Sequence, residues 1–254
     1  MKPLHAVLLG FALLALTSAA RLGVAAAASR SEKIRVLLVH GGHDFETNQF
    51  LQVFRDNPEV KLTVVQHPAA QAWFKPERAR EYDVLVFYDM WQTISDEAKA
   101  DLVALLKQGK PLVALHHCLG SFQKWDEYAN IIGGRYHLDR WMYHGMEKPG
   151  STYRHDVDFN IHVADPAHPI TRGVTDFAIH DETYGGFEVK PDSHVLLTTD
   201  EPSNGRNLAW WKTYGAARVV YLQLGHDHQA WDNANYRRLL AQAIRWAARQ
   251  GPDL

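Results

Sequence analysis

The sequence predicts an α/β fold in which a parallel sheet carries helices on both faces. Short apolar runs recur along the first half of the chain, at residues 34–39, 84–87 and 112–115. Each run ends in a turn of glycine or polar residues, and segments with helical spacing of apolar residues stand between the runs. Strand, helix, strand, helix with short turns is typical of a parallel sheet wound on both sides.

The first half of the chain provides most of the predicted sheet. Its predicted strands are residues 34–39, 60–66, 84–87 and 112–115, and its predicted helices are residues 46–55, residues 96–107 and a segment that runs through residue 131. The second helix has the clearest limits, because Ser95 is a good N-cap and Gly109 a good stop. Glycines in the turn at residues 40–45 let the backbone bend sharply and pass close to a ligand.

The second half of the chain changes character. Residues 133–150 are rich in glycine, histidine and aromatic residues and show no clean period, whereas residues 157–163 alternate as a half-exposed strand does. Further strands are predicted at residues 177–189 and 194–199, a hairpin at residues 208–212 and 218–224, and a final helix at residues 233–249. Without repeats or low-complexity linkers, one domain over residues 31–250 is the simplest prediction.

The N-terminus, residues 1–30, reads as a secretory signal peptide. Lys2 precedes an apolar segment at residues 6–16, and small residues follow at 17–20 and again at 25–29, so two cleavage points are open. We therefore expect an exported protein, periplasmic or extracellular, with no membrane segment after cleavage; an uncleaved anchor is the alternative. Cys118 is the single cysteine, which excludes an intramolecular disulfide.

Composition excludes several classes of partner. The 254 residues are 46% hydrophobic and 22% charged with a net charge of -2, which predicts a sizeable core and no nucleic-acid or polybasic membrane surface. Neither a GxGxxG fingerprint nor a GxxxxGK phosphate loop is present, so no nucleotide cofactor is predicted.

Polar residues of the kind that bind ligands follow four of the predicted strands. They are His40, His43 and Asp44; Asp89; His116, His117 and Cys118; and His226, Asp227 and His228. Open α/β sheets bind ligands beyond the carboxyl ends of their strands, so we expect these side chains to meet at one edge. A loop cluster of His180, Asp181 and Glu182 could fold over them.

Three kinds of chemistry fit this set of residues. Imidazole and carboxylate ligands suit Zn²⁺ and related divalent ions. Nucleophilic catalysis would use Cys118 with His226 as base, but His116 replaces the first glycine of the elbow pattern GxCxG, so Cys118 is interpreted as structural. General acid–base work on a polyol would use histidine and carboxylate groups, with aromatic side chains against the sugar ring.

The sequence assigns each candidate a role. The predicted catalytic residues are His180, Glu182, His226 and Asp227; the predicted substrate-binding residues are Asp89, Trp91, His117 and Tyr184; the predicted metal ligands are His43, His116 and His226.

Four segments resemble the trehalose-utilisation (ThuA-like) family. They are VHGGHDF from residue 39, LHHCLGSFQKWDEYANIIGGRY from residue 115, HPITRGVTDFAIHDETYGGF from residue 168 and LAWWKTYGAARVVYLQLGHD from residue 208. The resemblance spans residues 34–248 and implies a flavodoxin-like three-layer α/β/α domain, similar to class I glutamine amidotransferases. It places Cys118 at the amidotransferase nucleophile and His226 near its histidine, while Asp227 and His228 occupy the neighbourhood of its acid.

The resemblance also implies a role in sugar metabolism. Because the elbow glycine is lost and the acid is not clearly retained, glutaminase activity is not expected. Relatives are linked to disaccharides and their 3-keto derivatives, and some hold a metal. We therefore expect an exported enzyme that acts on a glycoside or 3-keto-sugar by metal-assisted or His/carboxylate acid–base chemistry, with Zn or another divalent ion as cofactor and a small-molecule carbohydrate as partner. The alternative is a non-catalytic sugar-binding or scaffold domain, and homo-oligomers are compatible with either.

Overall fold

The computed structural model describes residues 32–248, so the predicted signal peptide at residues 1–30 lies outside the described residues. The strands are β1 (Ile34–Gly41), β2 (Val60–Gln66), β3 (Val84–Asp89), β4 (Leu112–Leu115), β5 (Gly134–Arg135), β6 (Trp141–Tyr143), β7 (Met146–Lys148), β8 (Thr152–Val163), β9 (Phe177–Gly185), β10 (Glu188–Val189), β11 (His194–Thr198), β12 (Asn207–Tyr214) and β13 (Ala217–Leu222). The α-helices are α1 (Thr47–Arg55), α2 (Asp96–Lys107), α3 (Asp126–Ile132), α4 (His228–Trp231) and α5 (Ala234–Ala248), and the 3-10 helices are η1 (Ala69–Phe74), η2 (Ala79–Glu81) and η3 (His116–Gly120).

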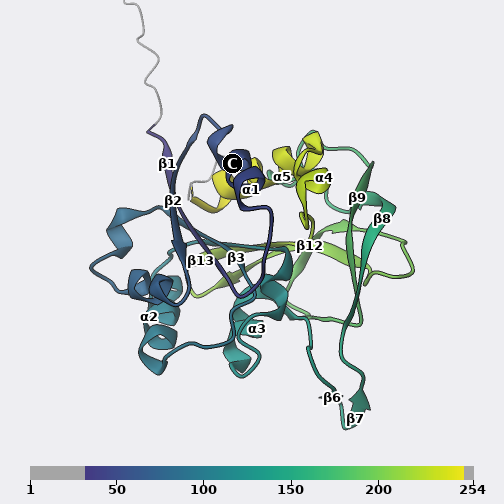
Figure 1. The fold of residues 1–254 in the computed structure, drawn as a ribbon, viewed down its shortest axis with the longest axis horizontal. Coiled ribbons are helices and arrows are strands. Elements are labelled where there is room, and N and C mark those ends of the chain that lie inside the picture. Colours follow the sequence, from purple (N-terminus) through teal and green to yellow (C-terminus); the bar gives the residue numbers. More distant parts are fainter. Residues whose placement is uncertain (1–31, 249–254) are drawn as a thin grey trace, which may run out of the picture. The chain divides into compact units, whose positions relative to one another are not determined.

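A nine-stranded mixed sheet forms the centre of the domain, in the order β2-β1-β3-β4-β13-β12-β11-β8-β9. The five strands from β2 to β13 pair in parallel, and the remaining strands extend the sheet by antiparallel pairing. Helices α1, α4 and α5 lie over one face of the parallel part, and α2 and α3 lie over the other (Figure 1). The predicted α/β fold with a parallel core and helices on both faces is therefore confirmed.

Alternation along the strands fills a core on each side of the sheet. In β1, Val36 and Leu38 are buried in the core that includes α1 and α5, whereas Leu37 and Val39 are buried in the core that includes α2 and α3. Successive side chains of a strand point to opposite faces, so a strand covered on both sides must be apolar at every position. This requirement explains the unbroken apolar runs of the sequence.

The structure differs from the predicted elements in several places, two of them around the candidate site. After β4 the chain first makes η3, and helix α3 does not begin until Asp126, because residues 116–120 form the tight turn that carries the predicted site. Residues 133–150, which show no clean period, contain β5 and the small hairpin β6–β7. No helix within residues 32–248 is long and apolar enough to cross a bilayer.

The turn after β1 brings the chain against the end of β3. Gly42 has a φ of 82°, and a Cβ there would lie 2.7 Å from the carbonyl carbon and oxygen of Met90 and 2.8 Å from the nitrogen of Trp91. Gly145, in the turn of the β6–β7 hairpin, has a similar φ of 78° but would place its Cβ at least 4 Å from any other group. The two glycines share a left-handed backbone and differ in crowding.

We expect Gly42→Ala to lower the free energy of unfolding clearly more than Gly145→Ala. The Gly145 variant should lose about 1–2 kcal/mol from the left-handed backbone alone. The Gly42 variant should lose this amount and a further steric contribution, because its neighbours are backbone atoms that cannot rotate away. Urea unfolding of both variants measures the difference, and equal losses would show that the turn relaxes without strain.

Candidate functional site

His116 is held in a strained backbone conformation directly after β4. Its φ is 50°, a left-handed value that non-glycine residues seldom adopt outside functional sites. Two contacts with β13 and its end fix it there: His116 Nδ1 lies 2.6 Å from the carbonyl oxygen of Gln223, and the Tyr221 hydroxyl donates to the His116 carbonyl at 2.8 Å. Because a carbonyl oxygen only accepts, Nδ1 donates to Gln223, and Nε2 is the ring nitrogen that faces Glu182 and Tyr184.

His226 follows β13 in a loop that is anchored by a buried carboxylate. Asp181 of β9 is fully buried and accepts the backbone N–H groups of Gly225 at 2.7 Å, His226 at 2.9 Å and Glu182 at 2.8 Å. Burial raises the pKa of Asp181, and these three donors oppose that effect. Asp181 thereby ties the loop that carries His226 to the strand that carries Glu182.

Glu182 completes a compact cluster with the two histidines. Its Oε2 lies 3.0 Å from His116 Nε2 and 3.2 Å from His226 Nδ1, and the two nitrogens are 3.3 Å apart. Burial alone would raise the pKa of Glu182, but the hydrogen bonds and charges of the two histidines bring it far below its usual range. Burial alone would lower the pKa of His226, and the hydrogen bond to Glu182 raises it instead.

The spacing of these three atoms fits a divalent ion. Ligands about 2.0–2.2 Å from an ion are separated by roughly 2.8–3.1 Å in octahedral and roughly 3.3–3.6 Å in tetrahedral geometry. The observed separations of 3.0, 3.2 and 3.3 Å span these ranges. Among the histidine, cysteine and acidic side chains of residues 32–248, these are the three, hereafter the triad, whose ligand atoms lie close enough together to hold an ion.

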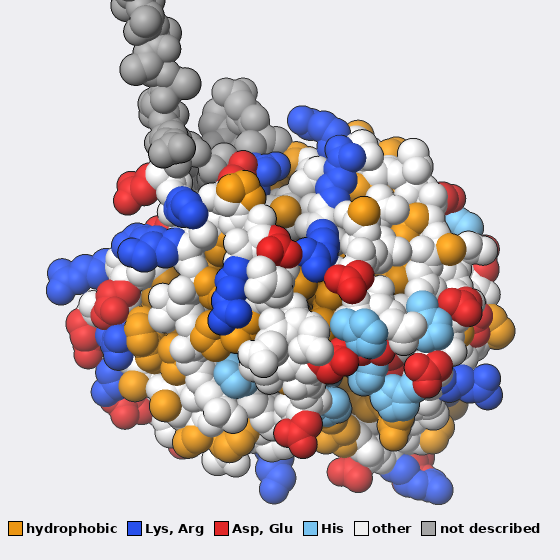
Figure 2. All heavy atoms as spheres, turned by 45° about the horizontal axis from the view of Figure 1, so that its top comes forward, with side chains coloured by type: hydrophobic (Ala, Val, Ile, Leu, Met, Phe, Trp, Pro, Cys, Tyr) orange, Lys and Arg blue, Asp and Glu red, His pale blue; other side chains and the backbone are white. Residues whose placement is uncertain are grey.

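A pocket of about 270 Å³ opens beside the triad. Its lining includes Glu182, Tyr184, His43 and His117, and the Tyr184 hydroxyl is 2.9 Å from His116 Nε2. His117 is buried and stacks on His43 with ring centroids 4.7 Å apart. Burial, followed by the nearby His116, lowers the pKa of His117 well below its usual value, so this imidazole is neutral. Figure 2 shows histidine side chains gathered among acidic ones on one part of this face.

His155 also lines the pocket, although the sequence analysis does not include it among the candidate site residues. Its Nδ1 lies 3.5 Å from Glu182 Oε1, and its ring centroid is 4.6 Å from that of His226. A bulge in β8 between Arg154 and Val157, with Asp156 at a φ of 57°, sets the direction of this side chain. The alternation of the strand begins only after the bulge, so the pattern gave no signal for residue 155.

Three other predicted site residues, His43, His180 and Asp227, do not belong to the triad. His43 lines the pocket, but its ring centroid is 6.5 Å from that of His226, and Glu182 takes the third position of the triad. His180 pairs with Asp158 at 2.9 Å and Asp156 at 3.5 Å rather than with the triad. The Asp227 side chain accepts from the backbone at the start of α4, so it is a helix cap.

Two predicted substrate-binding residues lie outside the pocket lining. Asp89 is fully buried and accepts from His67 at 2.9 Å, from the thiol of Cys118 at 3.2 Å and from Ser121 at 2.9 Å. Trp91 stacks on His67 with centroids 5.5 Å apart. Asp89 therefore supports the turn at residues 116–120 from beneath, because its carboxylate binds two residues of the segment that follows β4.

Comparison with known proteins identifies the family of this chain. The sequence profile of ThuA, described as trehalose utilisation, matches residues 35–247. The chain belongs to the ThuA family. No curated protein matches the chain.

Solved structures share the ThuA fold at low sequence identity. A ThuA-like protein from Parabacteroides merdae has a TM-score of 0.70 and 19% identity, over 87% of this chain and 94% of its own. A ThuA-like protein from Bacteroides uniformis has a TM-score of 0.68 and 17% identity, over 91% and 97%. A β-galactosidase from Bacillus circulans sp. alkalophilus has a TM-score of 0.54 and 10% identity, and the match covers 85% of this chain but 31% of the enzyme. These likenesses show the fold.

Cys118, at the amidotransferase nucleophile position that the resemblance implies, is enclosed in this ThuA chain. It has no exposed surface, and its thiol donates to Asp89 and accepts from the Asp89 N–H at 3.3 Å. Burial, followed by the charge of Asp89, raises the pKa of the thiol well above its usual value. A reactive cysteine needs an accessible thiolate, and this one has neither property.

We expect Cys118 in the folded protein to resist iodoacetamide. Intact-mass spectrometry should show no carbamidomethyl adduct at neutral pH, while the same protein in urea should take up one adduct. The denatured sample is the control, because Cys118 is the single thiol of the chain. Rapid alkylation of the folded protein would contradict the enclosed geometry and revive the nucleophilic interpretation.

Proposed function

We propose that His116, Glu182 and His226 bind a divalent ion such as Zn²⁺ and that the protein is an enzyme acting on a glycoside or keto-sugar. The observation that carries the proposal is the triangle of ligand atoms with sides of 3.0, 3.2 and 3.3 Å beside a pocket. Structural zinc sites use four protein ligands, whereas catalytic sites use three and leave a position open. Three ligands beside a cavity that Glu182 lines match the second class.

The surrounding residues prepare this triad for an ion. The Gln223 carbonyl holds the Nδ1 proton of His116, so Nε2 is the nitrogen that would coordinate an ion, which would take the place of the hydrogen bond between Nε2 and Glu182. The low pKa of Glu182 keeps its carboxylate ionised at neutral pH. The strained backbone of His116 and the buried anchor Asp181 fix both ends of the site, so little ordering remains when an ion binds.

A sugar with a carbonyl group suits this pocket. The tyrosine rings of Tyr136, Tyr153 and Tyr184 line it and offer flat apolar faces together with hydroxyl groups. An ion at the triad would supply Lewis acidity to the carbonyl oxygen. His155, beside Glu182, and the hydroxyl of Tyr184 lie where a proton or a substrate hydroxyl can be held. The trehalose-utilisation description of the family supports a sugar as substrate.

We propose export as well, on the basis of the signal-peptide pattern at residues 1–30. Fractionation of the source cells, followed by N-terminal sequencing of the mature protein, tests this. A protein that keeps residue 1 and stays in the cytoplasm would contradict it.

We expect the purified protein to bind one Zn²⁺ per chain in isothermal titration calorimetry after treatment with a chelator. Loss of a hydrogen-bonding partner of a metal ligand weakens binding about 10–100-fold, so loss of a ligand in His116→Ala or Glu182→Gln should weaken it at least about 100-fold. Turnover of 3-keto-glycosides should disappear with the chelator and return with added ion.

His180→Ala is the matched control, since His180 is a histidine of the same strand as Glu182 whose partners are Asp158 and Asp156. This variant should keep full metal affinity. Wild-type protein that binds no divalent ion, or a His116→Ala variant with unchanged turnover, would contradict the proposal. Retained sugar binding without turnover in the wild type would instead favour a non-catalytic sugar-binding domain.

A further inference from the structure

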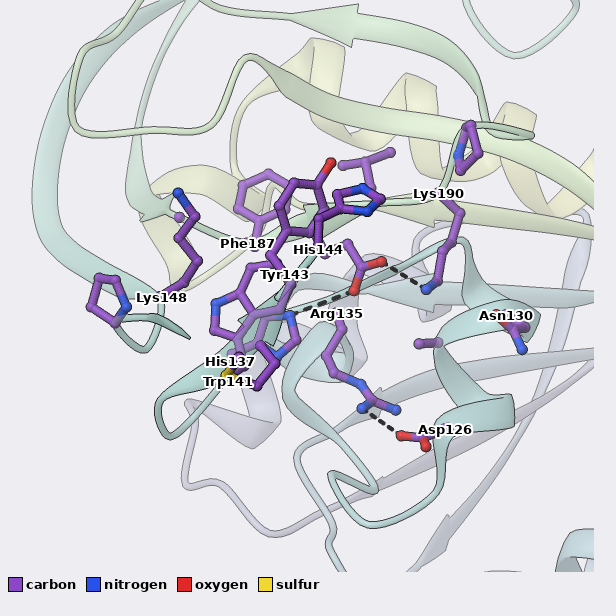
Figure 3. Close-up of a pocket in the computed structure, with 17 residues that line it drawn as sticks. Asp126, Asn130, Arg135, His137, Trp141, Tyr143, His144, Lys148, Phe187 and Lys190 are labelled. Atoms are coloured by element: carbon purple, nitrogen blue, oxygen red, sulfur yellow. Dashed lines mark hydrogen bonds and ion pairs between the residues drawn. The ribbon is translucent and has the colours of Figure 1, made fainter. Parts of the chain in front are cut away.

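A second and larger cavity lies next to the triad pocket. It is a groove of about 1190 Å³ between helix α3, the β6–β7 hairpin and the segment around β10 (Figure 3). The triad pocket measures about 270 Å³. Pockets that hold a drug-sized ligand have volumes of about 300–1,000 Å³, so the groove has room for a considerably longer molecule than the pocket.

One stretch of chain forms the wall between the two cavities. Arg135 and His137 line the groove, whereas Tyr136 and Leu138 line the triad pocket. Successive side chains of extended backbone point to opposite sides, so a single strand-like segment serves both cavities. The two cavities therefore flank one short segment, and a ligand longer than the pocket would have to pass over it to reach the groove.

The hairpin supplies an aromatic floor to the groove. Its register pairs Trp141 with Lys148 and Tyr143 with Met146, which places Trp141, Tyr143 and Lys148 on one face of the hairpin. Figure 3 shows Trp141 and Tyr143 in the groove beside His137. Trp141 stacks on His137 with centroids 3.8 Å apart and planes 6° apart, and Tyr143 is 43% exposed. An exposed aromatic face on a rigid support is a platform for a sugar ring.

Polar groups in the groove are arranged in neutralising pairs. Arg135 binds Asp126 at 2.8 Å, and Lys190 binds Glu188 at 2.7 Å, so Lys148 is left as the excess positive charge. Polyphosphates and nucleic acids need several uncompensated cations. Paired donors and acceptors beside aromatic rings match the hydroxyl groups and apolar faces of an uncharged sugar chain.

We propose that the groove binds the outer rings of a neutral oligosaccharide whose reacting ring occupies the triad pocket. This inference rests on the proposed function in assigning the reacting ring, but binding in the groove needs no ion. On this proposal the substrate is an oligosaccharide, and Tyr143 makes the protein prefer longer sugar chains by contacting an outer ring.

The test uses calorimetry on Glu182→Gln protein, which binds substrate without turnover if the triad is catalytic. The probes are glucose, maltohexaose, cellohexaose and laminarihexaose. At least one hexasaccharide should bind at least 10-fold more tightly than glucose. Adding Tyr143→Ala should reduce this preference at least 5-fold and leave glucose affinity unchanged. Arg140→Ala is the control, since Arg140 is in the same hairpin region, 76% exposed and paired with Glu147.

The outcomes separate this proposal from the proposed function. If all three hexasaccharides bind no better than glucose, the groove proposal is overturned while metal binding can still stand. Hexasaccharide binding that depends on Tyr143, together with wild-type protein that binds no divalent ion, supports the groove and removes the catalytic role of the triad. Sedimentation that shows a dimer broken by Tyr143→Ala, with no hexasaccharide binding, identifies the groove as an interface between two copies and overturns the proposal.

Discussion

The contact between Asp181 and the loop after β13 is the constraint on which the site depends. Asp181 is fully buried and takes the N–H groups of Gly225 and His226, so the loop cannot move without leaving a carboxylate unpaired in the core. Glu182, the next residue, turns to the opposite side of β9 and reaches both histidines. The two adjacent carboxylates therefore have different roles. Asp181 binds backbone N–H groups, and Glu182 faces the pocket.

Strain at His116 is the second part of this arrangement. A left-handed histidine is unfavourable by itself, and the bonds from Gln223 and Tyr221 offset that strain. The conformation has a chemical consequence, because it directs Nε2 at Glu182. In this turn His116 faces Glu182, while Cys118 is buried against Asp89.

The antiparallel extension of the sheet explains how a widespread fold acquires a particular site. Strands β8 and β9 contribute Glu182, Tyr184 and His155, and these residues meet histidines that follow the parallel strands. The segment at residues 134–138 then divides the space above this edge into two cavities. The family match spans residues 35–247 and therefore includes both the parallel core and this extension. The chemistry depends on the residues at the rim rather than on the fold.

Local patterns in the amino-acid sequence were sufficient to predict the parallel core and the residue types at its rim. The apolar run at residues 112–115 coincides with β4, and the helix predicted at residues 96–107 coincides with α2, because burial on two faces and a capped helical period are local properties. The strand predicted at residues 60–66 coincides with β2, an edge strand that is largely exposed. The sequence also brought His116, His226 and Glu182 into consideration. The roles assigned to these residues remain predictions.

Only the tertiary structure decided which of these side chains meet. Glu182 stands with His116 and His226 where His43 was expected, and Asp227 caps a four-residue helix that no pattern revealed. His155 enters through a bulge, and the hairpin at β6–β7 is too short to show a period. The physical reason is that contacts between β9, the turn after β4 and the loop after β13 join residues far apart in the chain. Long-range contacts of this kind leave no trace in the local spacing of apolar and polar residues.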